Sequence, residues 1–411
     1  MDAQINAKGL RPGAEIESAY AWLRLATALA LGTIGCIGMW SFVVALPAVQ
    51  AEFGLARGAA SLPFTLTMMG FGVGGVVMGR FADKSGVAWP LAGGALLLGG
   101  GYVMAGSAGS VWQFALAQGL IGFGSSAAFG PLMGDISHWF ARRRGIAVAV
   151  ASCGNYLAGT VWPPLVQHFI ARDGWRATHL VIGVLCVASM LPLVLAMRRR
   201  APQSGAVETG AAAAGASTLG LSPNALMVLL CIAGVGCCVA MAMPQVHIVA
   251  YCGDLGYGPA RGAEMLSAMM GFGLVSRIAC GFIADRIGGL QTLLLGSLLQ
   301  GVALFLYLWF DGLISLYVIS ALFGLFQGGI VPMYAIIVRE SFSPSETGVR
   351  LGIVLLATLV GMALGGWMSG AIFDFTGSYR AAFLNGIAWN LMNTGIVAWL
   401  LLRRPQRLVH A

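Results

Sequence analysis

The chain has 411 residues, of which 58% are apolar and only 9% are Asp, Glu, Lys or Arg, against about 25% charged residues in a typical soluble domain. So few polar residues cannot cover a water-facing surface, which excludes an ordinary soluble protein and favours a chain solvated by a lipid bilayer. The net charge of +8 comes from basic residues dispersed in short loops. Because they form no basic face, they do not indicate a nucleic-acid partner.

Long segments without charge follow one another along the chain, and each can supply the ~20 residues of a membrane helix. They are rich in Leu, Val, Ala and Gly and lack the alternation of barrel strands, so we expect helices. One run is about twice as long as a single helix and is divided by a turn at 106–110; another has one charge inside it, Arg277. The predicted segments are 25–51, 58–79, two within 87–134, 145–171, 177–197, 225–253, 265–284, 287–310, 312–338, 351–373 and 381–402.

These twelve segments fall into two sets of six on either side of a polar stretch rich in Ala and Gly. The predicted fold class is an all-α integral membrane protein with twelve transmembrane helices in two six-helix pseudo-symmetric bundles. Lys and Arg number seventeen on one set of connections and five on the other, which predicts cytoplasmic tails. The expected location is a bacterial inner membrane. The expected divisions are an N-terminal tail (1–24), an N-terminal bundle (25–197), a linker (198–222), a C-terminal bundle (223–402) and a C-terminal tail (403–411).

One charged turn is written twice, as GRFADKSG at 79–86 and GFIADRIG at 281–288. Both copies fit Gly-x-x-x-Asp-(Lys/Arg)-x-Gly, and each follows the second segment of its half. Two equivalent copies in two sets of six segments are typical of a duplicated transporter whose halves are parallel repeats.

The repeated turn predicts a gate. Its aspartates are expected to accept hydrogen bonds from a neighbouring helix N-terminus, and to pair with an arginine, only when the cytoplasmic end is closed. The first glycine of each copy is expected to allow close helix approach, and the last glycine a sharp turn. The predicted gating residues are Gly79, Asp83, Lys84 and Gly86 in the first copy, and Gly281, Asp285, Arg286 and Gly288 in the second.

Motifs for catalysis or cofactor binding are missing from the sequence. It contains no nucleophile constellation, no phosphate-binding Gly-Lys-Ser/Thr loop and no Rossmann fingerprint. The eight cysteines have no metal-ligand spacing and are interpreted as small buried hydrophobes. We therefore predict no enzyme activity, no cofactor, no metal and no ATP as the driving force.

Arg277 lies several residues inside the eighth segment. A guanidinium in hydrocarbon costs at least ~2.5–3.5 kcal/mol and requires a partner. Since no Asp or Glu lies within the other predicted segments, the expected partner is an anionic substrate, and a carboxylate matches the guanidinium fork. The alternative is a structural arginine bonded to helix carbonyls or to a water-filled seam.

Polar side chains near the middle of other segments are candidates to line the same cavity. For each of them, a hydrogen bond to a neighbouring helix is the competing interpretation. His247 alone among them titrates near neutral pH, which makes it the candidate proton site. The predicted substrate-binding residues are Arg277, Asn155, Tyr156, Gln245, His247, Gln327 and Tyr334.

Six stretches between about residues 45 and 402 resemble one known family. They are EFGLARGAASL, GRFADKSG, HWFARRRGIAVAVASCGNYLAG, VWPPLVQHFIARDGWR, GLVSRIACGFIADRIGG and VPMYAIIVRESF. The chain resembles the major facilitator superfamily and, through the Trp-Phe-x-x-Arg-Arg-Gly and Gly-Trp-Arg elements, its monocarboxylate transporter and oxalate:formate antiporter branch. The resemblance implies the major facilitator fold and a substrate-anchoring arginine in the eighth segment, which is Arg277 here.

The chain departs from that branch at two points. Similar animal members carry an Asp one turn before the arginine, where this chain has Gly273. The oxalate exchanger uses a Lys in the eleventh segment, whereas 351–373 contains neither Lys nor Arg here. A single cation in the site favours a substrate with one carboxylate over a compact dicarboxylate.

The predicted function is secondary transport of a small organic anion, a monocarboxylate, by alternating access in a monomer, as proton symport or anion exchange. An exporter of cationic or apolar drugs is the first alternative, but such chemistry needs a membrane carboxylate. A non-transporting membrane sensor is the second, and no soluble signalling domain is attached. The acidic residues nearest the segments lie at their edges, at Glu52, Asp135, Asp254 and Asp374.

Overall fold

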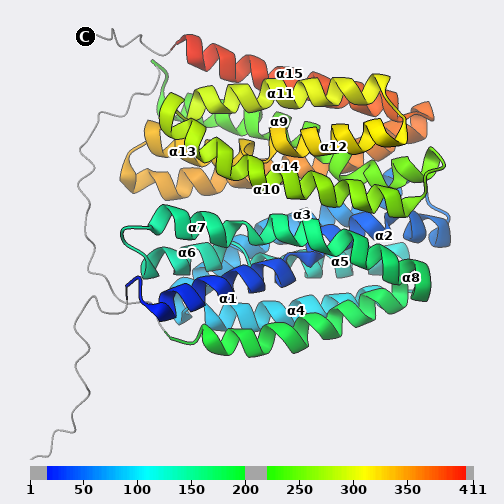
Figure 1. Ribbon diagram of the computed structural model, residues 1–411, viewed down its shortest axis with the longest axis horizontal. Helices are drawn as coiled ribbons and strands as arrows, with labels where there is room; N and C mark the ends of the chain where they lie inside the picture. The colour runs from blue at the N-terminus through cyan, green and yellow to red at the C-terminus, as the bar shows by residue number, and fades with distance from the viewer. Residues whose placement is uncertain (1–15, 200–219, 404–411) are drawn as a thin grey trace, which may run out of the picture.

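The computed structural model describes residues 16–199 and 220–403, and these contain helices and no strand (Figure 1). The predicted N-terminal tail before residue 16, linker residues 200–219 and the C-terminal tail beyond residue 403 lie outside the described residues.

The first half is built from eight helical elements, several of which are parts of one membrane segment. The helix is interrupted at Cys36, at residues 127–129 and at Cys153. Within α8, Gly174 has φ +81° and ψ 160°, so α8 holds two helices joined at a sharp bend. The elements are α1 (Ala19–Gly35), α2 (Ile37–Phe53), α3 (Arg57–Ser85), α4 (Ala88–Gly106), α5 (Val111–Ser126), α6 (Gly130–Trp139), α7 (Arg144–Ser152) and α8 (Gly154–Ala196).

The second half repeats this plan with fewer interruptions. Its tenth membrane segment is broken at residues 328–329, between α12 and α13. The elements are α9 (Pro223–Asp254), α10 (Pro259–Ile287), α11 (Gly289–Trp309), α12 (Leu313–Gln327), α13 (Ile330–Ser341), α14 (Pro344–Thr376) and α15 (Tyr379–Leu402).

Nine helical segments of the described chain are long and apolar enough to cross a membrane. One of them, Arg144–Ala196, holds two crossings because of the bend at Gly174. The α5–α6 pair and α15 add two further segments of comparable length. The prediction of an all-α membrane protein with twelve transmembrane helices is confirmed.

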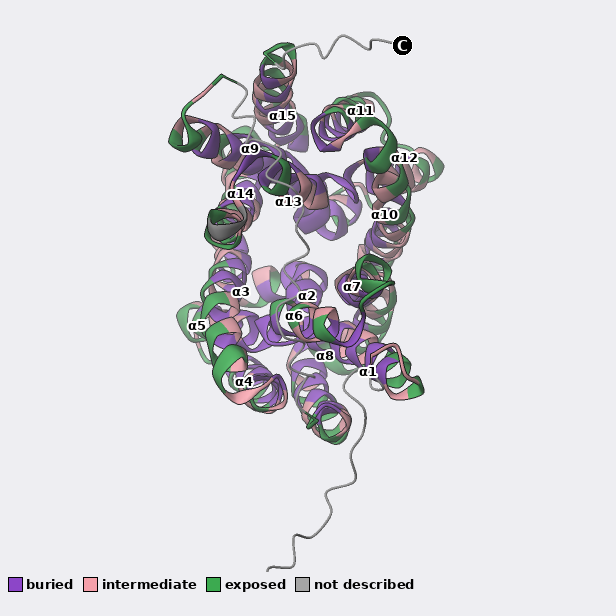
Figure 2. Ribbon diagram, turned by 90° about the vertical axis from the view of Figure 1, so that its left-hand side faces the viewer, coloured by how far each residue is buried: buried purple, intermediate pink, exposed green. Residues whose placement is uncertain are grey.

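Two bundles stack on each other, with α1 to α8 in one and α9 to α15 in the other (Figure 1). The principal contacts between them are α3 against α14, which lie side by side in Figure 2, and α8 against α10. A Cβ on Gly122 would overlap the carbonyl oxygen of Thr67, and a Cβ on Gly324 would overlap that of Met269. Each residue of the second pair lies 202 residues after its counterpart, the spacing of the two charged turns. The two halves therefore share one packing scheme.

The two ends of the molecule differ in how tightly the bundles meet. We call the end at which α8 finishes and α9 begins the linker end, and the opposite end the outer end (Figure 1). At the outer end, a Cβ on Gly58 would lie 3.1 Å from the backbone of Ala371, and one on Gly370 would lie 2.7 Å from the carbonyl oxygen of Arg57. All described hydrogen bonds between the bundles are found in the part of the molecule between the outer end and Arg277.

The glycines that open the two charged turns do not contact another helix in this conformation. Apart from the backbone of its own helix turn, nothing lies within 4 Å of a Cβ built on Gly79 or on Gly281. Neither glycine mediates a close helix approach in this conformation, because the seam between the bundles is not packed at the linker end. Among the described residues, the bundles are held together from the outer end to the level of Arg277, and no described hydrogen bond joins them at the two charged turns.

Candidate functional site

Arg277 reaches from the second bundle to the first. Its Nη1 donates a hydrogen bond to the carbonyl oxygen of Ser152 at 3.1 Å, and its guanidinium carbon lies 4.9 Å from the ring centroid of Tyr156. Its Nε is buried and has no hydrogen-bond partner. A structural arginine would be bonded to several helix carbonyls, but Arg277 makes a single hydrogen bond to one. No described carboxylate pairs with it.

The Ser152 carbonyl is available because of the interruption at Cys153. Ser152 is the last residue of α7, and the next helix starts at Gly154. Carbonyls at a helix C-terminus lack intrahelical partners and carry partial negative charge, so they attract a cation. The sequence signal that could have revealed this partner is weak, since Gly154 is one of sixty glycines.

Tyr156 fills the space beside Gly273. A Cβ on Gly273 would lie 2.5 Å from Cε1 of the Tyr156 ring, and the Tyr156 hydroxyl donates to the carbonyl oxygen of Gly328 at 3.2 Å. The ring therefore bridges the bundles and covers one face of the Arg277 guanidinium. The space that a side chain at position 273 would need is occupied here by a phenol from the other bundle.

Some of the remaining predicted lining residues lie near Tyr156 and Arg277, and others lie in the interior of the second bundle. Asn155, adjacent to Tyr156, accepts a hydrogen bond from the Trp40 indole at 3.1 Å. Gln327 is fully buried at the end of α12, and both of its amide atoms lack partners. Tyr334 instead donates to Asn393 at 3.0 Å within the second bundle, and Gln245 is buried in α9.

The structure places His247 away from Arg277, in a cluster that closes the outer end. Its Nδ1 lies 3.2 Å from the Tyr379 hydroxyl, and its Nε2 lies 2.8 Å from the carbonyl oxygen of Gly366. No hydrogen bond or ring contact links it to Arg277. Arg277 and His247, which were predicted to line one cavity, thus belong to two separate sites.

We call this cluster, made of Arg57, Asp254, Asp374, Tyr379 and His247, the outer lock. The Arg57 guanidinium donates to both carboxylate oxygens of Asp254 at 3.1 Å and to the Tyr379 hydroxyl at 2.7 Å. Asp374 accepts from the backbone amides of Arg57 and Gly58, both at 2.7 Å. Because the N-cap residue of α3 is an alanine without a capping oxygen, Asp374 of the other bundle caps this helix.

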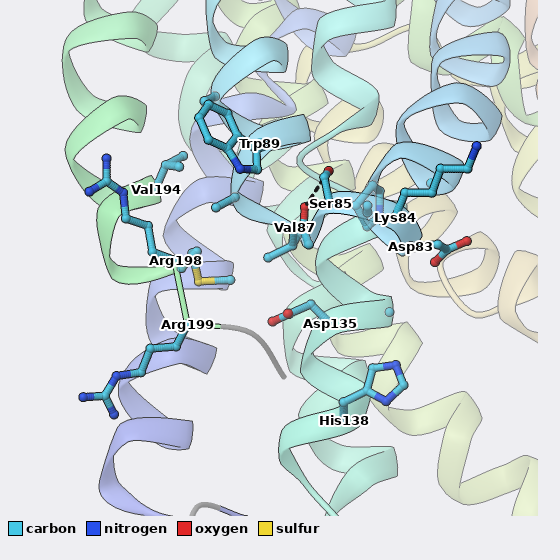
Figure 3. Close-up of a pocket in the computed structure, with 18 of the residues that line it drawn as sticks. Asp83, Lys84, Ser85, Val87, Trp89, Asp135, His138, Val194, Arg198 and Arg199 are labelled. Carbon is cyan, nitrogen blue, oxygen red and sulfur yellow. Dashed lines mark hydrogen bonds between the residues drawn. The ribbon is translucent and has the colours of Figure 1, made fainter. Parts of the chain in front are cut away.

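The first charged turn lies on a cavity of about 810 Å³ at the linker end of the first bundle. Gly79, Asp83, Lys84 and Gly86 line it, and none of the predicted substrate-binding residues does. Figure 3 shows Asp83 and Lys84 directed away from Asp135.

Both aspartates of the repeated turn, Asp83 and Asp285, are exposed, and neither has a hydrogen-bond or ion-pair partner among the described residues. Gly86 and Gly288 end α3 and α10 with φ of +83° and +89°, a backbone conformation that favours glycine. Arg286 is exposed like Lys84. The predicted pairing of these turns is therefore absent from this conformation, in which the linker end is not packed.

Arg24 and Asp135 require a correction. Arg24 was expected at the end of the N-terminal tail (1–24), and Asp135 at the edge of a segment. The structure buries both side chains, with Arg24 Nε and Nη2 donating to Asp135 at 2.7 and 2.8 Å. Arg24 also lies 4.7 Å from the ring of Trp139. A carboxylate is thus present inside the first bundle, but the pair joins α1 to α6 and leaves neither charge free.

The Gly-Trp-Arg element also acquires a structural explanation. Trp175 and Arg176 both donate to Glu52 at the end of α2, and Arg176 also donates to the carbonyl oxygens of Gly106 and Ala108. The element fastens three helix ends of the first bundle at the outer end. It contacts none of the Arg277 site.

Comparisons with known proteins agree with this architecture. The profile of the Major Facilitator Superfamily matches residues 28–315 and 254–410. Monocarboxylate transporter 13 of Bos taurus is 28% identical over 384 residues, which cover 91% of this chain and 86% of that protein. Monocarboxylate transporter 11 of Homo sapiens is 28% identical over 310 residues, covering 71% and 64%.

Solved structures share the fold at low identity. A bacterial homolog of the human lysosomal transporter Spinster, in an inward-facing and occupied conformation, superposes with a TM-score of 0.74 at 13% identity. The alignment covers 96% of this chain and 97% of that one. These relatives are transporters, in agreement with the prediction that the chain is not an enzyme.

Proposed function

The chain belongs to the Major Facilitator Superfamily and is a multi-pass membrane transporter, and on this premise we propose that it carries small monocarboxylates by alternating access between its two bundles. The observation that carries the proposal is the free edge of Arg277. Nη1 is bonded to Ser152, whereas Nε is buried without a partner and Nη2 has no described hydrogen bond. Nε and Nη2 form the edge of the guanidinium that can donate two parallel hydrogen bonds to one carboxylate.

Energetics favour a transient anion over a resident one at this edge. A charge inside the membrane requires compensation, and a single neutral carbonyl supplies only part of it. The buried carboxylate of the first bundle, Asp135, is bonded to Arg24, and the outer carboxylates are bonded in the outer lock. A substrate carboxylate would complete the coordination of Arg277.

A single carboxylate suits the site better than two. Gly273 carries no side chain, Tyr156 covers the adjacent face, and residues 351–373 of α14 contain no Lys or Arg. The unpaired amide of Gln327 is a candidate for a second, uncharged contact with the substrate. That two similar proteins are named monocarboxylate transporters supports this choice.

The difference between the two ends supports alternating access. In this conformation the outer lock is formed, while the charged turns at the linker end have no partners. We propose that Asp83, Lys84, Asp285 and Arg286 pair across helices when the linker end closes and the lock opens. The proposal retains cytoplasmic tails, the predicted bundle boundaries, a bacterial inner membrane and a monomer, with proton symport or anion exchange as the coupling.

A binding experiment tests the proposal directly. Purified protein is heated with a panel of monocarboxylates, dicarboxylates and organic cations, because a ligand that binds the folded state raises the unfolding temperature. Monocarboxylates should stabilise the chain, and Arg277→Ala should abolish the effect. Arg277→Lys keeps the charge but loses the fork, so affinity should fall by roughly ten- to more than a hundredfold if ~1.5–3 kcal/mol is lost.

The matched control is Arg172→Lys, because Arg172 forms an exposed ion pair with Asp173 beside the bend at Gly174 in α8. It should bind as the wild type does. Native affinity for a monocarboxylate in a folded Arg277→Ala variant would refute the role of Arg277, and stabilisation by organic cations alone would favour the exporter alternative.

A further inference from the structure

The outer lock contains a chain of hydrogen bonds in which the donor and the acceptor of each bond are fixed. Arg57 Nη1 donates to the Tyr379 hydroxyl at 2.7 Å, and that hydroxyl lies 3.2 Å from Nδ1 of His247. On the other side of the imidazole, Nε2 lies 2.8 Å from the Gly366 carbonyl oxygen, which can only accept. Nε2 must therefore carry a hydrogen, and Nδ1 accepts from Tyr379 in the neutral ring.

A second proton on His247 conflicts with this arrangement. An Nδ1–H would face the hydroxyl oxygen that already accepts from Arg57, and would leave the hydroxyl hydrogen without its acceptor. It would also place a second positive charge in a cluster where His247 is 0% exposed. Burying an additional charge without a counterion is costly.

The neighbouring acids do not relieve the conflict, because both are engaged. On His247's own helix, α9, Asp254 is bonded to both terminal nitrogens of Arg57. On α14, Asp374 is bonded to two backbone amides of α3. The other titratable groups on this side of the cluster are Arg57, which donates to the Tyr379 hydroxyl, and the Tyr379 phenol, which contacts the imidazole. Tyr251 packs against the Tyr379 ring.

We propose that His247 is the proton-binding site of an outer gate, and that protonation from the outer side holds the lock open. The inference rests on the proposed function in one respect, that the two bundles separate at the outer end during transport. It differs from a coupled proton carried with the substrate, because a protonated His247 opposes closure of the lock.

Linkage fixes the expected size of the effect. An imidazole reached by water titrates near pH 6.5. If the closed lock binds no proton at His247, lowering the pH from 7.5 to 5.5 shifts the open-to-closed ratio by roughly tenfold. The closed lock is thus most stable above the ordinary titration range of histidine and loses stability below it.

Ser61→Cys reports this equilibrium. Ser61 is 0% exposed, one turn behind Arg57 on α3, and its hydroxyl is bonded to the Arg57 carbonyl oxygen. Separation at the outer end would expose it. The variant is labelled in lipid nanodiscs with a thiol reagent at pH 7.5 and 5.5, with the unmutated chain as the blank for native cysteines. Each rate is divided by that of the exposed variant Arg172→Cys at the same pH, which removes the effect of pH on thiol reactivity.

The normalised rate at Ser61→Cys should rise roughly tenfold on acidification. Adding His247→Gln should remove the rise, because an amide can donate to Gly366 and accept from Tyr379 but does not titrate in this range. Asp254→Asn should raise labelling at pH 7.5, which establishes that the reporter detects an opened lock. A flat profile at Ser61→Cys, or an equal rise with His247→Gln present, would overturn the proposal.

Tyr379→Phe provides a second reading should His247→Gln fail to fold. It removes the hydroxyl that conflicts with an Nδ1 proton, so labelling at pH 7.5 should rise and the pH ratio should fall below tenfold. An unchanged ratio would contradict the inference. The labelling assay contains no substrate, so its result is independent of the substrate assignment. If the labelling rate does not change with pH in a chain that binds monocarboxylates, only this inference is refuted. If the rate depends on pH in a chain that binds no monocarboxylate, this inference is supported and the substrate assignment is refuted.

Discussion

Gly273→Ala is expected to destabilise the fold, even though alanine is a better helix former than glycine. The new Cβ would lie 2.5 Å from Cε1 and 3.0 Å from Cδ1 of Tyr156. The ring cannot retreat without loosening its hydrogen bond to Gly328 and its contact with Arg277. Overpacking costs about 1–3 kcal/mol and the hydrogen bond about 0.5–1.5 kcal/mol, against a helix-propensity gain of about 1 kcal/mol. The net loss of stability should be about 0.5–3.5 kcal/mol.

Gly281→Ala is the matched control, because it lies on the same helix with nothing within 4 Å of the added Cβ. It should be neutral or stabilise by about 0.5–1 kcal/mol. Thermal unfolding of the purified variants provides the comparison. Combining Gly273→Ala with Tyr156→Leu should recover part of the loss, with a coupling of at least about 1 kcal/mol in the double-mutant cycle.

Equal unfolding temperatures for Gly273→Ala and Gly281→Ala would refute the packing of Tyr156 against Gly273. Strict additivity in the cycle would show that the two positions do not touch. Either result would also remove the bridge that places Tyr156 over the guanidinium of Arg277.

Three further predictions concern the first bundle and the linker end. Asp135→Asn strands the buried Arg24 and should cost about 3–5 kcal/mol in thermal unfolding; stability equal to wild type would show that the pair is not buried. Asp83→Asn and Asp285→Asn should increase labelling of cysteines placed at the linker end, because each removes a contact expected only when that end is closed, and unchanged labelling in both would remove their gating role. Gly281→Ala should fold normally but should slow transport if another helix packs against residue 281 when the linker end closes. An unaltered transport rate would contradict that expected helix contact.

Local composition determined the fold class and the segments. A helix in lipid must satisfy its own backbone groups, so a run of about twenty uncharged residues can be recognised as a membrane helix without knowledge of the neighbouring helices. The spacing of the two charged turns likewise revealed the duplication, and the packing of Gly122 on Thr67 and of Gly324 on Met269 follows the same repeat. Arg277 could be recognised because a charge inside an apolar segment is costly wherever the segment packs.

The partners of these residues were decided by the tertiary structure alone. Arg277 meets Ser152 from a segment 125 positions away, and Asp374 caps a helix that begins at Arg57, 317 positions away. His247 was predicted beside the substrate, but the approach of α14 and α15 places it in the outer lock. The sequence determines which side chains need a partner, because desolvation is a property of each residue and its segment. Which partner each receives depends on how distant helices cross, and that is settled only when the two bundles pack.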